Sequence, residues 1–593
     1  MAVQAKTTLF IDGKQITNFK SYTLDQFIND HHTLEISCRM DALDNLSESL
    51  ANSSKNFLGK TVLLEITSNN IFENYKPLQF KGVVVKVSSI KGINDRNEVI
   101  ITAYSPTIVA DDGPHYASYC DTTLDDMVQS SLKEYDQSKL KTVIKSQNSN
   151  NIVYSVQHNE SNWQYVSRLA QQYGQWLYYN GQDLVFGTPE DKEEVQLTQG
   201  KDLLSFSLEL LPLPNRFNFF TGDYAIDELH EKKSDDVNTG VNGFHNFTSN
   251  VSKDLYSKET RVWVNQVDNP EQKSQLNQHI ELRKKVIEQQ QFSVAGISNN
   301  PGVMVGQKIN ITTDGLSEGS FRVTKVSHFN NSNGNYQNTF EAISSQTDIF
   351  PDTNVFAFPK SESQVAVVTE NADPDGLGRI KVQFSWQKQD GEMTSWLRVL
   401  TPHSGGEKGF HFIPEIGEEV LIGFEGGNAE RPYVMGSLYN GNAKPEGWKT
   451  EKNDIKAIRT RSGHTLSFSD ESGGESITIT DKNGNSIVLD TANSTISISA
   501  PDAINLSSKE ININASDAIN IDGTNKVNVT SKEIVNDGSA KVIVNSKTKV
   551  EVGAPSTLVV GKAELKLTSK GMTDIDGTTM TNVKGGLLNL NCG

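Results

Sequence analysis

Residues 496–529 read ISISAPDAINLSSKEININASDAINIDGTNKVNV, in which a triplet of an aliphatic, a polar and an aliphatic residue recurs every seven or eight residues. Similar triplets begin at Ile477 and continue to Leu590. Alternation with a period of two is typical of a β-strand that buries one face, and the Ser, Thr, Asn, Asp and Gly residues between the triplets are turn formers. The fixed short period predicts stacked β-units, none of which can bury its apolar face alone.

Each unit offers two inward-facing aliphatic residues, worth roughly 1.5–3 kcal/mol apiece if fully buried. A single chain folded as a ribbon of such strands would leave open edges and an uncovered apolar face. A wide single-chain solenoid is one solution, but three residues per side are too few to close its coil. The spacing therefore favours intertwined chains, most simply three, over a solenoid or a surface-exposed β-rich tail. The residues predicted to line the shared axis of this homotrimer are Ile496, Ile498, Ile504, Leu506, Ile511, Ile513, Ile519, Ile521, Val527 and Val529.

Length and composition limit the number of domains and the kinds of partner, cofactor and cellular location that the chain can have. The 593 residues are enough for several domains. A net charge of −18 argues against binding to nucleic acid or to an anionic membrane surface. Cys38, Cys120 and Cys592 are far apart and odd in number, so we expect neither disulfides nor a zinc site, and no cofactor. We also expect no Sec-type signal, because residues 1–10 contain no apolar core, and no membrane insertion, because no long apolar run occurs.

Upstream of the repeat, alternating and helical patterns predict a β-rich region with a few helices. Helices are expected over 124–135, after the capping sequence 121–123, and over 161–173, where Gly174 would end the helix. A hairpin at Asn180-Gly181 should join two strands within 176–185. Residues 225–258 are polar and are predicted to be a long loop, followed by a charged helix over 271–290. Strands are expected over 7–11, 34–40, 62–67, 80–87, 99–104, 321–327 and 338–344, with turn, short strand, turn and strand over 301–309.

A second β-rich region lies between the proline-containing segment 350–362, which resembles a linker, and the repeat. Short strands over 365–369, 379–384, 396–399, 419–424 and 433–438 predict a small barrel. Trp386 and Trp396 should lie in its core or contact a neighbouring domain. Residues 444–448 are expected to turn the chain into the repeat.

Two patterns that suggest chemistry have simpler interpretations. Residues 315–319 fit the G-x-S-x-G pattern of hydrolases, but that motif needs a helix after it, and a strand pattern follows here. We therefore interpret Ser317 as part of a hairpin turn. The pair His31-His32, together with His403 and His411, has no metal-ligand partners at useful spacing, and we expect surface or loop histidines.

Several motifs of this chain resemble those of VgrG, the spike-protein family of type VI secretion systems. Residues 373–382 (DPDGLGRIKV), 409–424 (GFHFIPEIGEEVLIGF) and 431–441 (RPYVMGSLYNG) are similar to the family's OB-fold barrel. Residues 157–163 (QHNESNW), with Arg168, Leu169 and Gly174 after them and the turn 301–306 further on, resemble its phage hub-like domain. The resemblance follows the family's order along nearly the whole chain and is weakest over residues 1–150.

The resemblance implies a mainly β multidomain fold. Residues 1–350 would form the phage hub-like domain of two β-barrel-like subdomains with helices, and 363–442 the OB-fold barrel. Linkers would cover 351–362 and 443–470, and residues 471–593 would form a trimeric triple-stranded β-helix needle. No globular extension follows the needle in this sequence, so a fused toxin is not expected.

The function implied is that of a structural spike, not an enzyme, at the tip of a contractile injection apparatus, where it would puncture the target envelope. A PAAR-type tip protein would dock on Leu588 and Leu590. Inner tube (Hcp-like) and baseplate proteins would bind the hub, and effectors with their chaperones or adaptors would travel with the spike. The protein would assemble in the bacterial cytoplasm and leave without a signal peptide. The alternatives are a spike of a phage tail or extracellular injection particle, and a β-helix enzyme that degrades polysaccharides.

Overall fold

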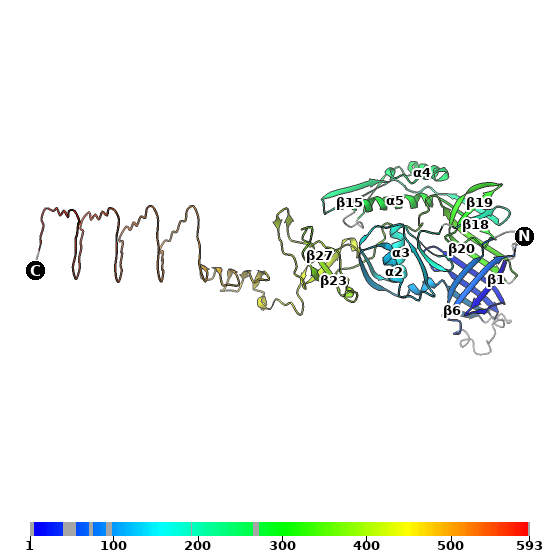
Figure 1. Cartoon of the computed structure of the whole chain (residues 1–593), viewed down its shortest axis with the longest axis horizontal. Helices are drawn as coiled ribbons and strands as arrows, with labels where there is room; N and C mark the ends of the chain where they lie inside the picture. The colour runs from blue at the N-terminus through cyan, green and yellow to red at the C-terminus, as the bar shows by residue number, and fades with distance from the viewer. Residues whose placement is uncertain are drawn as a thin grey trace. The chain divides into compact units, whose positions relative to one another are not determined.

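The computed structural model describes residues 5–39, 55–69, 75–90, 98–190, 192–264, 272–331 and 333–590 (Figure 1). The chain divides into two units, residues 1–456 and 457–593, each of which is described by itself. Met40, at the end of one expected strand, and Cys592 lie outside the described residues.

The largest element of the first unit is a sheet with thirteen described strands. Its main path runs β14-β18-β21-β20-β3-β4-β7-β6-β5-β1-β2, and β19 joins β13 to β20. Strand β3 pairs with β20, so the sheet connects chain segments about three hundred residues apart. The strands are β1 (Ala5–Ile11), β2 (Lys14–Gln15), β3 (Phe19–Phe27), β4 (Thr33–Arg39), β5 (Thr61–Ser68), β6 (Leu78–Ile90), β7 (Glu98–Tyr104), β13 (Val195–Thr198), β14 (Leu203–Leu210), β18 (Phe292–Ser298), β19 (Lys308–Thr313), β20 (Leu316–Asn331) and β21 (Tyr336–Ser344).

The strand predictions for this sheet are confirmed at β1, β4, β5, β6, β7, β20 and β21, within a few residues. Strand β3 was missed because its buried face consists of Tyr22, Leu24 and Gln26, and the buried glutamine interrupts the apolar alternation. The short strand expected between the two turns of 301–309 is absent. Val303 and Val305 are buried in a turn, and β19 begins only at Lys308.

Two predicted helices lie beside this sheet. Thr123 caps α2 (Leu124–Leu132). Helix α3 (Asn162–Tyr173) begins with a capping box between Ser161 and Gln164 and ends at Gly174, whose φ of 64° is left-handed. The apolar stripe of α3 packs into the core, as predicted. The neighbouring strands are β8 (His115–Thr122), β9 (Lys141–Lys145), β10 (Ile152–Glu160), β11 (Trp176–Tyr179) and β12 (Asp183–Gly187).

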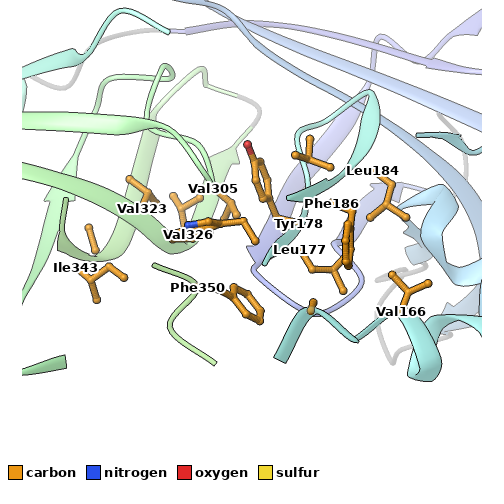
Figure 2. Packing of buried hydrophobic residues seen from close by; sticks show 14 of the residues in the cluster. Val166, Leu177, Tyr178, Leu184, Phe186, Val305, Val323, Val326, Ile343 and Phe350 are labelled. Carbon is orange, nitrogen blue, oxygen red and sulfur yellow. The ribbon is translucent and has the colours of Figure 1, made fainter. Parts of the chain in front are cut away.

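The core of this unit connects these helices with the large sheet. Figure 2 shows Val166 of α3 and Leu177 and Phe186 of the β11–β12 hairpin on one side, and Val323 and Ile343 of the sheet on the other. Phe350, in the segment that resembles a linker, is fully buried here and packs on Trp176 with ring centroids 6.0 Å apart. This segment is therefore anchored in the core at its start.

The prediction of a long loop over 225–258 was wrong. The segment forms β16 (Glu228–Lys233), the 3-10 helix η3 (Ser234–Asp236) and helix α4 (Gly243–Leu255). Strand β16 pairs with β15 (Phe217–Asp223), which also pairs with β17 (Thr260–Trp263). The loop prediction failed because α4 buries polar residues: Ser249 donates to Glu288 of α5 (Gln272–Gln290) over 3.2 Å. Hydrogen bonds replace the apolar stripe that would have indicated a helix.

The expected barrel contains β22 (Gln364–Glu370), β23 (Lys381–Phe384), β26 (Glu419–Phe424) and β27 (Pro432–Leu438), in the order β23-β22-β26-β27. The expected strand over 396–399 contributes only two isolated bridges, from Leu397 to Ile380 and from Val399 to Val434. The hairpin of β24 (Ser404–Gly405) and β25 (Lys408–Gly409) is a separate two-stranded sheet of exposed residues. Short 3-10 helices are η2 (Pro106–Ala110), η4 (Ser385–Gln387), η5 (Glu425–Gly427) and η6 (Glu446–Trp448).

The second unit begins as an antiparallel meander and continues as the repeat. The meander contains β28 (Ile455–Arg459), which crosses the boundary between units, β29 (Thr465–Ser469), β30 (Ser476–Thr480), β31 (Ser486–Asp490) and β32 (Thr495–Ser499). Three triplets thus form strands, as predicted. Among the described residues after β32, bends recur at short intervals and no strand hydrogen bonding is assigned (Figure 1).

Candidate assembly surfaces

The repeat is the first candidate surface because its aliphatic side chains are exposed. The ten residues predicted to line a trimer axis are 51–71% exposed, and Leu588 and Leu590 are 58% and 80% exposed. Monomeric soluble proteins rarely expose apolar patches beyond a few hundred Å². In a single chain nothing covers these side chains. This exposure is what the prediction of intertwined chains, made from the spacing of the repeat, requires. Their inward orientation in an assembly and the docking role of the last two leucines stay predictions.

The second candidate surface is the junction between the barrel and the N-terminal part of the same unit. Its centre is Arg168 of α3, which is 7% exposed and lies between two carboxylates. Arg168 Nε donates to Glu160 Oε1 over 2.8 Å, and Nη1 donates to Glu430 Oε1 of the barrel over 3.1 Å. Burial alone would lower the pKa of Arg168, but Glu430 and Glu160 raise it above its usual value. The guanidinium therefore stays charged inside the junction.

Glu430 also binds the backbone of the N-terminal part. Its Oε1 accepts from Ser155 Oγ over 2.9 Å and from the Val156 amide over 3.2 Å. The Glu430 carboxylate therefore accepts hydrogen bonds from three donors across the junction. These hydrogen bonds offset the free-energy cost of burying its charge. Arg168 belonged to a motif noted in the sequence, but Glu430 was not identified as a site residue. Its position directly before the RPYVMG motif was the only available signal.

Aromatic and polar contacts surround this ion cluster. Gln387 Nε2 donates to Ser118 Oγ over 2.7 Å, and Gln364 Nε2 donates to His158 Nε2 over 2.8 Å. Trp386 stacks on Phe384 in the barrel and also approaches Tyr116 of β8, with centroids 6.0 Å apart. Trp386 thus both covers the barrel core and contacts the neighbouring part, the two roles that the sequence left open. Many side-chain contacts at the junction, in addition to the covalent connection, hold the barrel against the N-terminal part of the unit.

Ser317 does not form a nucleophile elbow. The turn is at Asp314 and Gly315, both left-handed, and Ser317 follows it in strand β20. Its hydroxyl donates to the Asn310 side chain over 3.2 Å and accepts from the Gly319 amide over 3.3 Å. The hairpin interpretation is confirmed, and this serine has no helix to support it as a nucleophile.

The prediction for His31 and His32 was wrong in part, because both are buried rather than on the surface. His31 packs on Trp163, and the His32 ring lies against Phe80 and Tyr179. Burial lowers the pKa of His32 to about 3, so the ring is neutral at ordinary pH. His403 and His411 are exposed, as expected. Within the described ranges, no group of His, Cys, Asp and Glu has metal-binding geometry, and no helix there is long and apolar enough to cross a bilayer.

Comparison with known proteins agrees with this arrangement. Residues 364–439 match the type VI secretion system/phage-baseplate injector OB domain, and residues 27–197 match the phage tail baseplate hub (GPD). The chain therefore contains one segment similar to a phage-baseplate hub and one similar to an injector OB domain.

Curated relatives are similar to a short part of the chain. A spike protein of the Pseudomonas aeruginosa type VI system, VgrG4b, is 35% identical over 103 residues, which are 16% of this chain and 13% of the relative. The actin cross-linking toxin VgrG1 of Vibrio cholerae is 31% identical over 111 residues, 17% of this chain and 10% of that protein. The alignments thus span about a tenth of these relatives' lengths. The Francisella PdpA-VgrG complex shares the fold at 10% identity, with a TM-score of 0.53 over 84% of this chain and 80% of that one. Parts of this chain are thus similar to VgrG spike proteins of type VI systems and to the phage tail baseplate hub.

Proposed function

We propose that the protein is a homotrimeric, non-enzymatic spike at the tip of a contractile injection apparatus. The observation that carries the proposal is the exposure of the repeat, whose paired aliphatics are uncovered along unit after unit. Three chains wound around one axis would cover these faces and pair the free strand edges. At about 4.8 Å between hydrogen-bonded strands, some fifteen units would give a needle on the order of 70–100 Å long.

The spike would act mechanically. Contraction of a sheath elsewhere supplies the force, and the intertwined repeat supplies a stiff, narrow point that punctures the target envelope. The matched hub domain would bind the inner tube and baseplate proteins. A PAAR-type tip protein would sit on three copies of Leu588 and Leu590, and effectors with their adaptors would be carried along. Assembly in the cytoplasm and export by the apparatus itself, without a signal peptide, complete the proposal.

The test of this function is the mass of the assembled protein. The chain is 65.4 kDa, and light scattering after size exclusion should give three times that mass. Replacing Ile511 and Ile513 by Asp places charges on the shared axis, where an unpaired buried charge is costly, so the trimer should dissociate or fray. The matched control is Asn512→Asp, which adds a charge at the alternate position of the same triplet and should leave the trimer intact. A wild-type protein that stays monomeric would contradict the proposal.

A further inference from the structure

A cleft of about 550 Å³ lies beside the C-terminal end of α3, apart from the repeat and from the barrel junction. Its walls come from four segments of the first unit: the end of α3, residues 147–153 at the start of β10, one side of α5, and residues 347–349 after β21. The volume falls within the range of about 300–1,000 Å³ that is usual for small-molecule sites. All four segments belong to one chain, so the cleft does not need assembly to form.

Helix α5 separates the cleft from an apolar cluster, because its two sides differ in composition. Leu276, Ile280 and Ile287 are buried in that cluster. Residues at spacings of three and four share one side of a helix. The cleft side is mostly polar and carries Gln275, Gln278, His279, Leu282 and Lys285.

Part of the cleft surface is apolar and closely packed. Gly174 ends α3 in the left-handed conformation, and a Cβ there would lie 2.8 Å from Leu282 Cδ2 of α5. The same position is 3.6 Å from Ile349 Cδ1. The glycine therefore lets the end of α3 approach α5 closely, and Leu282 and Ile349 give the cleft an apolar patch.

The rest of the wall is rich in amide side chains, since Asn and Gln are the most frequent residues that line the cleft. Gln175 holds this wall in place. Its Oε1 accepts from the Gln147 amide over 2.9 Å, and its Nε2 donates to the Tyr173 carbonyl over 2.7 Å. The segment before β10 is thereby fixed to the end of α3. Gln278 on α5 is exposed, so its amide is available to a ligand.

Two buried polar groups of the lining lack a partner. Within the described ranges, nothing forms a hydrogen bond with His279 Nδ1 or with Thr347 Oγ1. His279 is 8% exposed, and burial lowers its pKa to about 4, so the imidazole is neutral at ordinary pH. An unpaired buried polar group is costly. Rotation about the side-chain bonds would present both groups to a ligand that supplies hydroxyl or amide partners.

The ionised groups of the wall already have counter-ions. Lys285 pairs with Glu281 one turn earlier on α5, and Asp348 pairs with Arg322 of β20. Asp121, at the end of β8, is exposed to solvent. The cleft therefore offers hydrogen bonds and an apolar patch rather than a net charge, which suits a neutral ligand.

We propose that this cleft binds a neutral N-acetylated sugar of one or two rings. The hydroxyl groups of such a sugar match the donors and acceptors of the amide wall. Its acetamido group supplies one more amide, with a methyl group that fits the patch of Leu282 and Ile349. A peptide suits the cleft less well, because extended peptides are held by backbone pairing with a strand edge, whereas helix sides and a loop form most of these walls.

The test is binding of N,N′-diacetylchitobiose to the full chain, followed by saturation-transfer NMR and by the rise in thermal midpoint that a bound ligand causes. Cellobiose, which has hydroxyl groups in place of the acetamido groups, is the matched probe. We expect the acetylated disaccharide to bind about tenfold more tightly than cellobiose. No binding at millimolar sugar, or equal binding of the two sugars, would overturn the proposal. Tighter binding of a capped triglycine peptide would assign the cleft to peptides and also overturn it.

Variants of α5 locate the binding. Gln278→Leu removes an exposed amide of the cleft and should weaken binding about tenfold. The control is Asn277→Leu, which changes an exposed amide at the next position, outside the lining, and should bind as the wild type does. Equal binding by these two variants would contradict the site.

A third variant separates binding from folding. His279→Phe keeps a ring of similar shape but removes the unpartnered nitrogen. The thermal midpoint without sugar should not fall, whereas the rise caused by the sugar should shrink. An unchanged rise in this variant would show that His279 does not contact the sugar and would overturn the proposal as stated.

Discussion

Replacing Glu430 by Ala should loosen the barrel from the rest of its unit. The substitution removes the acceptor of three donors: Ser155 Oγ, the Val156 amide and Arg168 Nη1. Breaking a buried ion pair costs about 3–5 kcal/mol. Arg168 keeps Glu160 as a partner and also donates to the Val156 carbonyl over 2.6 Å, which reduces the loss. We therefore expect a cost of about 3 kcal/mol, chiefly from the orphaned amide and the half-paired guanidinium.

The assay is amide hydrogen exchange over β10 and the barrel strands. A cost of about 3 kcal/mol in local opening corresponds to exchange that is roughly a hundredfold faster. Glu430→Gln keeps an acceptor oxygen and should lose about 1–2 kcal/mol. The control is Glu425→Ala, because Glu425 pairs with Arg431 within the barrel, is 38% exposed, and should change exchange by less than about 1 kcal/mol. Exchange in the Glu430→Ala variant that matches the control would show that the ion cluster does not hold the junction, and the argument would fail.

Three further predictions follow from the other sites. Ser317→Ala should leave secretion and target killing unchanged, because the hydroxyl only bridges a hairpin; lost activity in a folded variant would reopen the hydrolase interpretation. Burial lowers the pKa of His32 and of His328 to about 3, whereas each titrates near 6.5 when unfolded, so the unfolded state binds more protons between these values. The free energy of unfolding should therefore fall by about 2 kcal/mol for each of these histidines from pH 7 to pH 5, as urea titrations would measure. His32→Gln should make this fall smaller by about 2 kcal/mol, and an unaltered pH dependence would contradict the assignment. Leu588→Asp with Leu590→Asp should abolish pull-down of a PAAR-type tip protein while light scattering still shows the trimer, and undiminished binding would mean that the tip protein docks elsewhere.

The local pattern of apolar residues predicted those helices and strands whose buried positions are apolar and regularly spaced. Helix α3 was predicted from its apolar stripe and from Gly174 at its end, and the structure adds a capping box between Ser161 and Gln164 at its start. The β11–β12 hairpin and four of the five barrel strands followed from alternation and turn residues. The same rules failed where polar groups are buried. Strand β3 buries Gln26, and α4 buries Ser249 and Ser252. A search for apolar periodicity predicts loop where polar residues such as these occupy the buried positions.

The sequence by itself determined that the repeat presents two aliphatics per unit with a period of seven or eight residues, and this spacing is the basis for the prediction that several chains cover them. It also determined the order of the domains, since the barrel and hub motifs consist of contiguous residues. Only the tertiary structure decided where the barrel is held, because Arg168 and Glu430 are 262 residues apart and no local period relates them. The exposure of Phe410 and Phe412 could not be foreseen either, for a different reason. A phenylalanine in a barrel motif is expected to be core until the hydrogen-bonded hairpin beside Gly409 is seen to hold it in solvent.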